Sequence, residues 1–254
     1  MILAIDIGNT NIVIGCVDQE KTYFIERIST DRSKTELEYA IMIKNVLDIY
    51  KIAARDLEGG IVCSVVPQIT QIVRIAAEKI LQKSVMVLGP GIKTGMNILM
   101  DNPAQVGSDL IADAVGAISE YPAPLIIFDM GTATTVCVVD QKKNYIGGMI
   151  LPGVRTSLDA LTARAAQLSG IDLVAPKRTI GKNTIECMKS GIINSNAASV
   201  DGIITRIEEE MGEKATVVAT GGLAKCIIPH CRQEVIMDED LLLKGLLKIY
   251  EKNR

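Results

Sequence analysis

The chain has 254 residues, of which 48% are hydrophobic and 22% are charged, as in globular rather than disordered proteins. A net charge of −3 and only 3% aromatic residues exclude a broad basic face and a base-stacking platform, so we expect no nucleic acid partner. No apolar run is long enough to span a bilayer, and the six scattered cysteines fit a reducing compartment. We therefore expect a cytoplasmic protein without a membrane partner.

The first predicted element is a strand, a tight polar turn and a second strand. Residues 2–5 are apolar, Asp6-Ile7-Gly8-Asn9-Thr10 forms the turn, and residues 12–17 are again mostly apolar. A third strand is predicted over residues 22–28, which would complete an antiparallel meander. The turn places a carboxylate at a strand end, followed by a glycine and by hydroxyl or amide side chains. Such a turn offers backbone N–H donors and an anchored carboxylate, which suit a phosphate and a cation.

Helices and strands then alternate. Apolar spacing predicts a helix over 36–50, a buried strand over 60–66, a helix over 69–81 and a strand over 85–88. The order β-β-β-α-β-α-β favours a sheet whose later strands are parallel. A further helix over 106–119 would carry Gly107-Ser108-Asp109 in its first turn.

The strand-turn-strand pattern restarts after Pro122 and Pro124. Residues 125–128 are apolar, Asp129-Met130-Gly131-Thr132 comes next, and residues 136–139 form the next predicted strand. Residues 16–19 also recur at 138–141, one residue out of step. The repeat predicts two duplicated α/β domains, 1–120 and 121–254, with a nucleotide cleft between them.

The second half is expected to continue as a strand over 145–151 and a helix from 153 to about 165. An irregular segment over 168–178 precedes a long helical region over 184–211, with a break expected around Ser195. A buried strand over 215–219 would end in Thr220-Gly221-Gly222, where small residues let backbone approach a ligand. A short strand over 234–237 and an amphipathic helix over 240–250 would close the second domain.

The two Asp-x-Gly turns are the main functional signal. For a single copy, a simple turn capped by the aspartate is the plainer interpretation. Two copies between buried strands favour a nucleotide site. Other phosphate-binding motifs are missing, because no Walker sequence is present and no helix is expected to open after Gly89-Pro90-Gly91.

A general base has few candidates in this chain. The sequence contains one histidine, which argues against a Ser/His/Asp hydrolase. Asp109 is the best candidate, since a helix start favours the ionised carboxylate. An ordinary aspartate at a helix start is the alternative interpretation, and Asp113 is a weaker candidate one turn later.

Several motifs occur together in one order along the chain: Asp6-Ile7-Gly8-Asn9-Thr10, Ser64-Val65-Val66-Pro67, Val106-Gly107-Ser108-Asp109, Asp129-Met130-Gly131-Thr132 and Thr220-Gly221-Gly222. With them the chain resembles type III pantothenate kinases over nearly its whole length. That family belongs to the actin-like and sugar-kinase superfamily, whose members contain two duplicated RNase H-like domains.

The resemblance implies ATP-dependent phosphorylation of pantothenate to 4′-phosphopantothenate, the first step of coenzyme A biosynthesis. It implies a cytoplasmic homodimer that uses Mg²⁺ with ATP and a monovalent cation, K⁺ or NH₄⁺. Asp109 would accept the proton of the substrate hydroxyl, Asp129 would bind the monovalent cation, and Asp6 would lie near Mg²⁺. The implied ATP-binding residues are Asp6, Ile7, Gly8, Asn9, Thr10, Asn11, Ile12, Val13 and Thr132. The implied substrate-binding residues are Met100, Gly107, Ser108, Asp109, Leu110 and Thr184.

Two departures from the family pattern fall on the acceptor side. The family's Gly-Ala-Asp-Arg reads Gly107-Ser108-Asp109-Leu110 here, and Met100 stands where the family has a tyrosine. The missing arginine is the one expected to bind the pantothenate carboxylate. Losing a charge-assisted hydrogen bond costs roughly 1.5–3 kcal/mol, or about 10- to 150-fold in affinity. Arg155 and Arg164 are candidate substitutes.

These departures leave two alternative functions open. One is a small-molecule kinase that phosphorylates a related small alcohol in place of pantothenate. The other is an ATP-binding regulatory or accessory protein with little activity.

Overall fold

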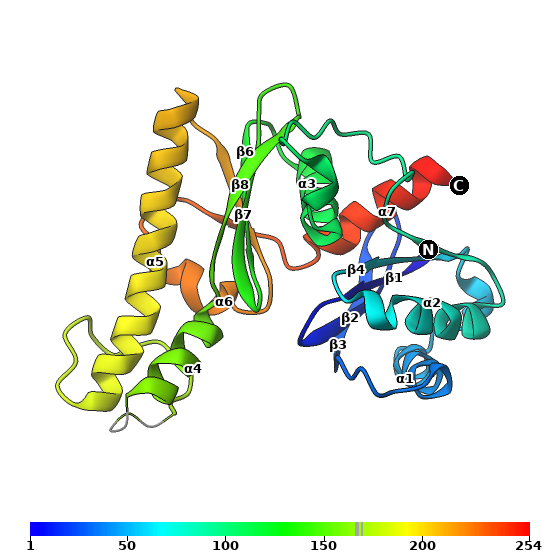
Figure 1. Cartoon of the computed structure of the whole chain (residues 1–254), viewed down its shortest axis with the longest axis horizontal. Coiled ribbons are helices and arrows are strands. Elements are labelled where there is room, and N and C mark those ends of the chain that lie inside the picture. The colour runs from blue at the N-terminus through cyan, green and yellow to red at the C-terminus, as the bar shows by residue number, and fades with distance from the viewer. Residues whose placement is uncertain (166–167, 169) are drawn as a thin grey trace. The chain divides into compact units, whose positions relative to one another are not determined.

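The computed structural model describes residues 1–165, 168 and 170–254, and the chain folds into two compact units (Figure 1). The first unit contains Met1–Met96, Asp101–Glu120 and Asp240–Arg254. The second unit contains Asn97–Met100 and Tyr121–Glu239. The closing helix, which sequence order assigned to the second half, therefore lies in the first unit.

The first unit contains a five-stranded sheet with the order β3-β2-β1-β4-β5. The first three strands form the predicted antiparallel meander, and the last two run parallel to β1. The strands are β1 (Ile2–Ile7), β2 (Asn11–Val17), β3 (Thr22–Ser29), β4 (Gly60–Ser64) and β5 (Val85–Val87). The helices between them are α1 (Glu36–Ile49), η1 (Ala54–Asp56) and α2 (Pro67–Leu81).

Side chains of β1 alternate between two apolar layers, as the period of a strand requires. Leu3, Ile5 and Ile7 pack with α1 and α2, whereas Ile2 and Ala4 pack with helices on the opposite face. Those helices are α3 (Ser108–Glu120), which comes after the short η2 (Pro103–Gln105), and α7 (Leu241–Asn253). Figure 1 shows α1 and α2 on one side of this sheet and α7 on the other. Asp6 follows the alternation of Ala4 and so belongs to the α3 face.

Helix α7 belongs to the first unit because its apolar side packs against α3 and the first sheet. Leu243, Leu246 and Ile249 are buried in the same cluster as residues of β1, β4 and α3. The two helices approach closely at a glycine, since a Cβ on Gly245 would lie 1.8 Å from the Ala112 carbonyl oxygen. This long-range packing, and not sequence order, decides which unit contains the last helix.

The second unit repeats the first sheet. Its order is β10-β9-β6-β7-β8, with an antiparallel meander followed by parallel strands. The strands are β6 (Leu125–Met130), β7 (Ala133–Val139), β8 (Tyr145–Pro152), β9 (Thr216–Thr220) and β10 (Ile236–Met237). Even the irregularity in pairing recurs, between Cys16 and Val17 in one unit and between Val138 and Val139 in the other. The predicted duplication is confirmed by this shared topology.

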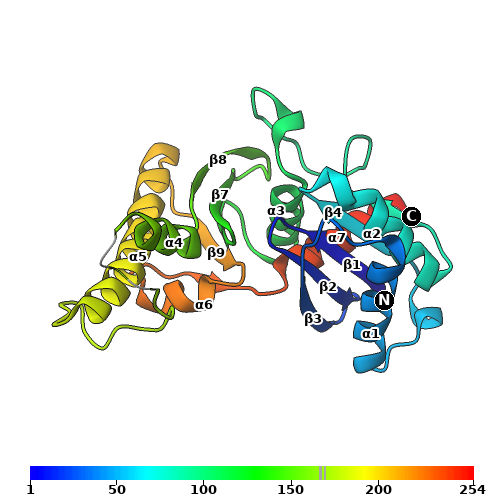
Figure 2. The ribbon, with the colours of Figure 1, turned by 60° about the horizontal axis from the view of Figure 1, so that its bottom comes forward.

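Helices of the second unit cover one face of its sheet (Figure 2). They are α4 (Val154–Arg164), α5 (Thr184–Met211), α6 (Ala224–Ile227) and the short η3 (Ile228–His230). The break expected around Ser195 is wrong, because α5 is continuous through that position. The Ser195 hydroxyl donates to the Ile192 carbonyl at 3.3 Å, and the Asn196 amide donates to the same oxygen at 2.8 Å. These polar side chains hydrogen-bond within the helix and do not interrupt it.

The segment between α4 and α5 was expected to be irregular over 168–178. Residue 169 of that range lies outside the described residues, as do 166 and 167, and the described remainder forms no helix or strand. Within the described part of the chain, no helix is both long and apolar enough to cross a membrane.

Candidate functional site

The first polar turn is held by hydrogen bonds from within and from the end of β3. The Gly8 N–H donates to the Asn11 carbonyl at 3.0 Å, which closes the turn. The Thr30 hydroxyl donates to the Gly8 carbonyl at 2.7 Å, and the Thr30 N–H donates to the Thr10 carbonyl at 3.0 Å. Residues 9–11 are exposed at the tip. Thr30 therefore holds the turn at its base, while the exposed tip is accessible to a ligand.

Asp6 lies beside this turn, at the carboxyl end of β1. It pairs with Cys63 of the parallel strand β4. Burial, and then the negative charge of Asp6, raise the pKa of the Cys63 thiol well above its ordinary value. Asp6 thus contributes a carboxylate charge in a poorly solvated place. Mg²⁺ prefers oxygen ligands and is usually held by one or two carboxylates together with phosphate oxygens and water, so Asp6 fits such an ion.

Asp109 lies in the first turn of α3, and its side chain folds back onto the helix start. Its Oδ1 accepts the Leu110 N–H at 2.9 Å. Gly107 leaves the necessary room, because a Cβ there would lie 2.3 Å from that same oxygen. The helix start was expected to favour the ionised carboxylate, but burial outweighs it and raises the pKa of the Asp109 carboxyl, although hydrogen bonds from backbone N–H groups oppose the rise. A carboxylate with a raised pKa is a stronger base, which suits proton acceptance.

The structure brings Asp6 and Asp109 to one place in the first unit. The charges of both residues contribute to the raised pKa of the Cys63 thiol, which lies in the buried layer between β4 and α3. Asp113, the weaker candidate, is fully buried one turn further along α3. A side chain without exposed surface cannot meet a substrate, so the geometry favours Asp109.

The second polar turn comes after β6 and is one residue shorter than the first. Its Gly131 N–H donates to the Ala133 carbonyl at 3.0 Å. The Thr156 hydroxyl, from the first turn of α4, donates to the Thr132 carbonyl at 2.7 Å. Gly153 also touches this turn, because a Cβ there would lie 2.2 Å from the Thr132 oxygen. Thr132 is therefore fixed against the start of α4.

Asp129 lies near the end of β6 and is approached by backbone from the neighbouring strand. Gly221, just after β9, has a φ of +92°, and a Cβ on it would lie 2.5 Å from Asp129 Oδ1 and 2.6 Å from the Met130 nitrogen. Only glycine fits here, on both conformational and steric grounds. A carboxylate with main chain packed against it supplies oxygen ligands of the kind that alkali cations accept.

The remaining predicted acceptor-side residues are divided between the units. Leu110 is half-buried in α3 of the first unit, beside Asp109. Met100 and Thr184 are exposed residues of the second unit, Thr184 being the first residue of α5. Arg155 and Arg164 are exposed on α4. The contact of these residues with an acceptor stays a prediction.

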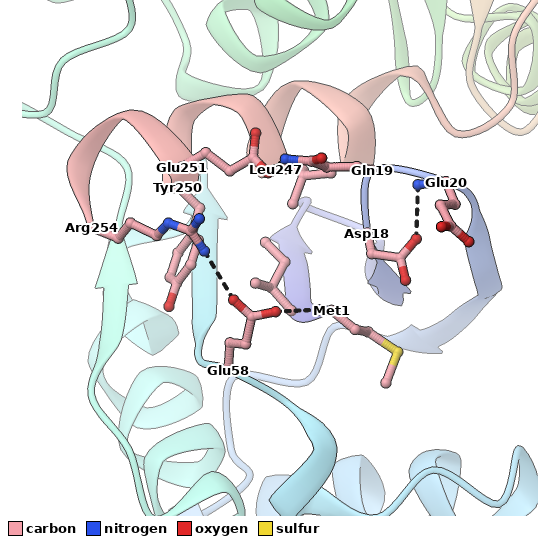
Figure 3. Close-up of a pocket in the computed structure, with 10 residues that line it drawn as sticks. Met1, Asp18, Gln19, Glu20, Glu58, Leu247, Tyr250, Glu251 and Arg254 are labelled. Atoms are coloured by element: carbon pink, nitrogen blue, oxygen red, sulfur yellow. Dashed lines mark hydrogen bonds and ion pairs between the residues drawn. The ribbon is translucent and has the colours of Figure 1, made fainter.

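A cavity of about 430 Å³ in the first unit lies at the opposite end of β1 from Asp6 (Figure 3). The Glu58 carboxylate lines this cavity. It accepts hydrogen bonds from the Met1 amino group at 2.7 Å and from the Arg254 guanidinium at 3.0 Å. The lining also includes the carboxylates of Asp18, Glu20 and Glu251. Because carboxylates outnumber the cations, this cavity does not suit the phosphates of ATP.

Cys63, Thr30 and Thr156 were not identified from the sequence. Cys63 has the character of an ordinary apolar strand residue, although it directly precedes the Ser64-Val65-Val66-Pro67 motif. The two threonines come after the third strand of their respective units, 22 and 24 residues from the carbonyls that they brace. A search for hydroxyl residues after the third strand of each repeat would have found both threonines.

Comparisons with known proteins agree with this arrangement. A family model described as "Type III pantothenate kinase" matches residues 2–206. A protein of that name from an Exiguobacterium species is 46% identical over 254 residues, covering 100% of both chains. Another from Bacillus cytotoxicus is 45% identical over 253 residues, covering 100% of this chain and 97% of the relative.

Solved structures of more distant proteins share the fold. The activator of 2-hydroxyisocaproyl-CoA dehydratase from Clostridium difficile, solved with bound ADPNP, has a TM-score of 0.58 at 16% identity, covering 98% of this chain and 93% of its own. Component A of the Acidaminococcus fermentans (R)-2-hydroxyglutaryl-CoA dehydratase has a TM-score of 0.60 at 16% identity, covering 98% and 96%. At these identities the likeness concerns the fold, which is that of two duplicated actin-like domains.

Proposed function

Because the chain belongs to the type III pantothenate kinase family, we propose that it phosphorylates pantothenate with Asp109 as the proton acceptor. The reaction of the family is the ATP-dependent formation of 4′-phosphopantothenate, the first step of coenzyme A biosynthesis. The observation that carries the assignment of Asp109 is its desolvated carboxylate at the start of α3, close to Asp6 beside the first polar turn.

Asp109 removes the proton of the primary hydroxyl of pantothenate as that oxygen attacks the γ-phosphorus of ATP. The bond to the β,γ-bridging oxygen breaks, and ADP leaves with the electron pair. Proton acceptance contributes about 10²–10⁴-fold to such reactions, and positioning with charge neutralisation contributes most of the remainder. Gly107, Ser108 and Leu110 border the acceptor from the same helix start, with Met100 and Thr184 as further acceptor-side residues.

The phosphates of ATP bind the first polar turn. Its exposed tip and its braced carbonyls support this role for Asp6 and residues 7–13. Thr132 contacts ATP from the second turn. The sequence domain 1–120 thus supplies the first polar turn and the base on the acceptor side, and the sequence domain 121–254 supplies the second polar turn on the nucleotide side.

Two cations complete the proposed site. Mg²⁺ bound with ATP neutralises phosphate charge when present, and Asp6 offers it a carboxylate oxygen. Asp129 holds a monovalent cation, K⁺ or NH₄⁺, with the main chain around Gly221 packed against it. Asp129 takes the place in β6 that Asp6 takes in β1, which supports a cation-binding role for its carboxylate.

We also propose a homodimer in the cytoplasm. Exposed apolar side chains occur in β8, α4 and the start of α5, and include Ile150 at 79% exposure, Met149, Leu161 and Ile185. Apolar surface of this kind is typical of protein interfaces. Light scattering during size-exclusion chromatography would test the dimer. The six free cysteines fit a reducing compartment.

A direct assay tests the function. Purified protein with ATP, Mg²⁺ and K⁺ is offered pantothenate and a panel of small alcohols, and ADP formation is followed. We expect pantothenate to be the preferred acceptor. Preference for another alcohol, or ATP binding without turnover, would contradict the proposal and revive one of the two alternatives.

Those alternatives are not favoured, because relatives named for pantothenate phosphorylation match the chain over its full length. Leu110→Arg tests what the departure at this position costs. Supplying the missing cation should lower the KM for pantothenate about tenfold or more, as a charge-assisted hydrogen bond would. Leu110→Met is the matched control and should leave KM unchanged. An unchanged KM in the arginine variant would place carboxylate recognition elsewhere.

A further inference from the structure

The hydroxyl of Ser108 makes a cluster of contacts at the end of β4. It donates to the Ser64 carbonyl at 3.0 Å and accepts the Ser64 N–H at 3.2 Å. The Cys63 thiol lies 3.2 Å from the same oxygen and donates to it. The hydroxyl thus satisfies both polar groups of the Ser64 main chain, much as a neighbouring strand would.

Ser64 is in turn tied to the first polar turn and to α2. The next residue, Val65, donates its N–H to the Ile7 carbonyl at 3.0 Å, immediately before the turn. The Ser64 hydroxyl accepts the Val66 N–H at 3.1 Å and lies 2.7 Å from the Thr70 hydroxyl. Ser64 is therefore a fixed point at the edge of the turn proposed to bind phosphate.

Asp109 is the residue directly after Ser108. A movement of the helix start would move the carboxylate relative to Asp6 and the turn. Near-attack geometry tolerates little displacement, and an error of about 1 Å can cost about 100-fold in rate. The three contacts of the Ser108 hydroxyl join the first residue of α3 directly to β4 and so oppose such a movement.

We infer that Ser108 is a positioning residue that fixes the proton-accepting Asp109 relative to the phosphate turn, by bridging α3 to the end of β4. This inference rests on the proposed function of Asp109. The Ser108 hydroxyl already makes its hydrogen bonds to Ser64 and Cys63, so Ser108 would border the acceptor through its backbone.

The experiment compares steady-state kinetics of three variants with the wild-type protein, using pantothenate and ATP. Ser108→Ala restores the alanine of the family pattern but removes the hydroxyl that bonds both main-chain polar groups of Ser64 in this chain. It should lower kcat about tenfold, corresponding to about 1.4 kcal/mol, with the KM for ATP unchanged. Ser108→Thr retains the hydroxyl and should recover most of kcat. Ser119→Ala is the matched control, since it removes a hydroxyl of α3 that bonds within the helix, to the Gly116 carbonyl at 2.8 Å and beside Glu120. It should leave kcat unchanged.

Amide hydrogen exchange tests the bridge without activity. The Ser64 N–H should lose protection in Ser108→Ala and keep it in Ser119→Ala. A kcat of Ser108→Ala within twofold of wild type overturns the positioning role, as does unchanged protection of Ser64. If the wild-type protein does not phosphorylate pantothenate, the proposed function fails; exchange at Ser64 then still decides whether the bridge exists.

Discussion

The two units share a sheet topology but differ at one position at the end of the strand that runs parallel to β1 or β6. This position follows the residue that pairs with Asp6 in the first unit and with Asp129 in the second. In the first unit, the residue after the partner of Asp6 is Ser64, whose carbonyl accepts a hydrogen bond from the hydroxyl of Ser108, the residue before Asp109. In the second unit, the residue after the partner of Asp129 is Gly221, whose main chain presses on Asp129 itself. The two sheets thus share a topology, but a hydroxyl side chain meets this position in the first unit, whereas in the second unit the main chain at this position lies against the carboxylate.

The largest effect should come from removing the base. Asp109→Asn keeps an oxygen for the Leu110 N–H but cannot accept a proton at neutral pH, so kcat should fall about 10²–10⁴-fold. Initial rates of ADP formation with pantothenate measure this. Asp48→Asn, an exposed carboxylate of α1 paired with Lys44, is the control and should retain full activity. Near-normal turnover of Asp109→Asn would contradict the proposal that the first unit supplies the proton-accepting residue.

The next largest effect concerns the second unit. Gly221→Ala forces a side chain into Asp129 and Met130 and strains a positive φ, which together cost roughly 2–5 kcal/mol. Urea unfolding would measure the loss of stability, and the K⁺ dependence of activity would measure the effect on Asp129. Gly212→Ala is a matched control, because Gly212 has a φ of +73° with nothing within 4 Å of an added Cβ. If Gly221→Ala and Gly212→Ala lost equal amounts of stability, the strain of a positive φ alone, and not crowding of Asp129, would be responsible.

A smaller and paired effect concerns the two bracing hydroxyls. Thr30→Val and Thr156→Val each remove one hydrogen bond to a turn carbonyl, which costs about 0.5–1.5 kcal/mol of stability. If the first turn carries most of the phosphate contacts, Thr30→Val should raise the KM for ATP more than Thr156→Val. The reverse order in KM would assign the main phosphate contacts to the second turn.

The smallest effect is on the pH dependence of stability. Burial raises the folded-state pKa of the Asp109 carboxyl above its unfolded value, which favours the protonated form. The favourable contribution of Asp109 to the free energy of unfolding is therefore complete below its unfolded-state pKa, and it is lost as the pH rises through its folded-state pKa. Wild type should lose stability relative to Asp109→Asn across that window, as thermal melts at several pH values would show. A constant difference in Tm would contradict a raised pKa.

Local sequence predicted the frame of each unit well. The meander, the parallel strands and the two Asp-x-Gly turns are recognisable from apolar periodicity and glycine placement over fewer than about ten residues each. Asp109 could be proposed as the base from the sequence, because a carboxylate at a helix start is recognisable in a single sequence. The break at Ser195 was wrong because polar residues can bond inside a helix, which their identity alone does not reveal.

The repeated strand-turn-strand unit, its carboxylates and, through the order of the motifs, the family could all be read from the chain alone. Three pairings emerged only from the folded molecule: α7 joins the first unit, Ser108 meets Ser64, and Gly221 meets Asp129. Ser108 and Ser64 are 44 residues apart, and α7 and β1 lie near opposite ends of the chain. Periodicity and turn chemistry act between near neighbours in the chain, whereas such contacts arise when packed layers bring distant segments together.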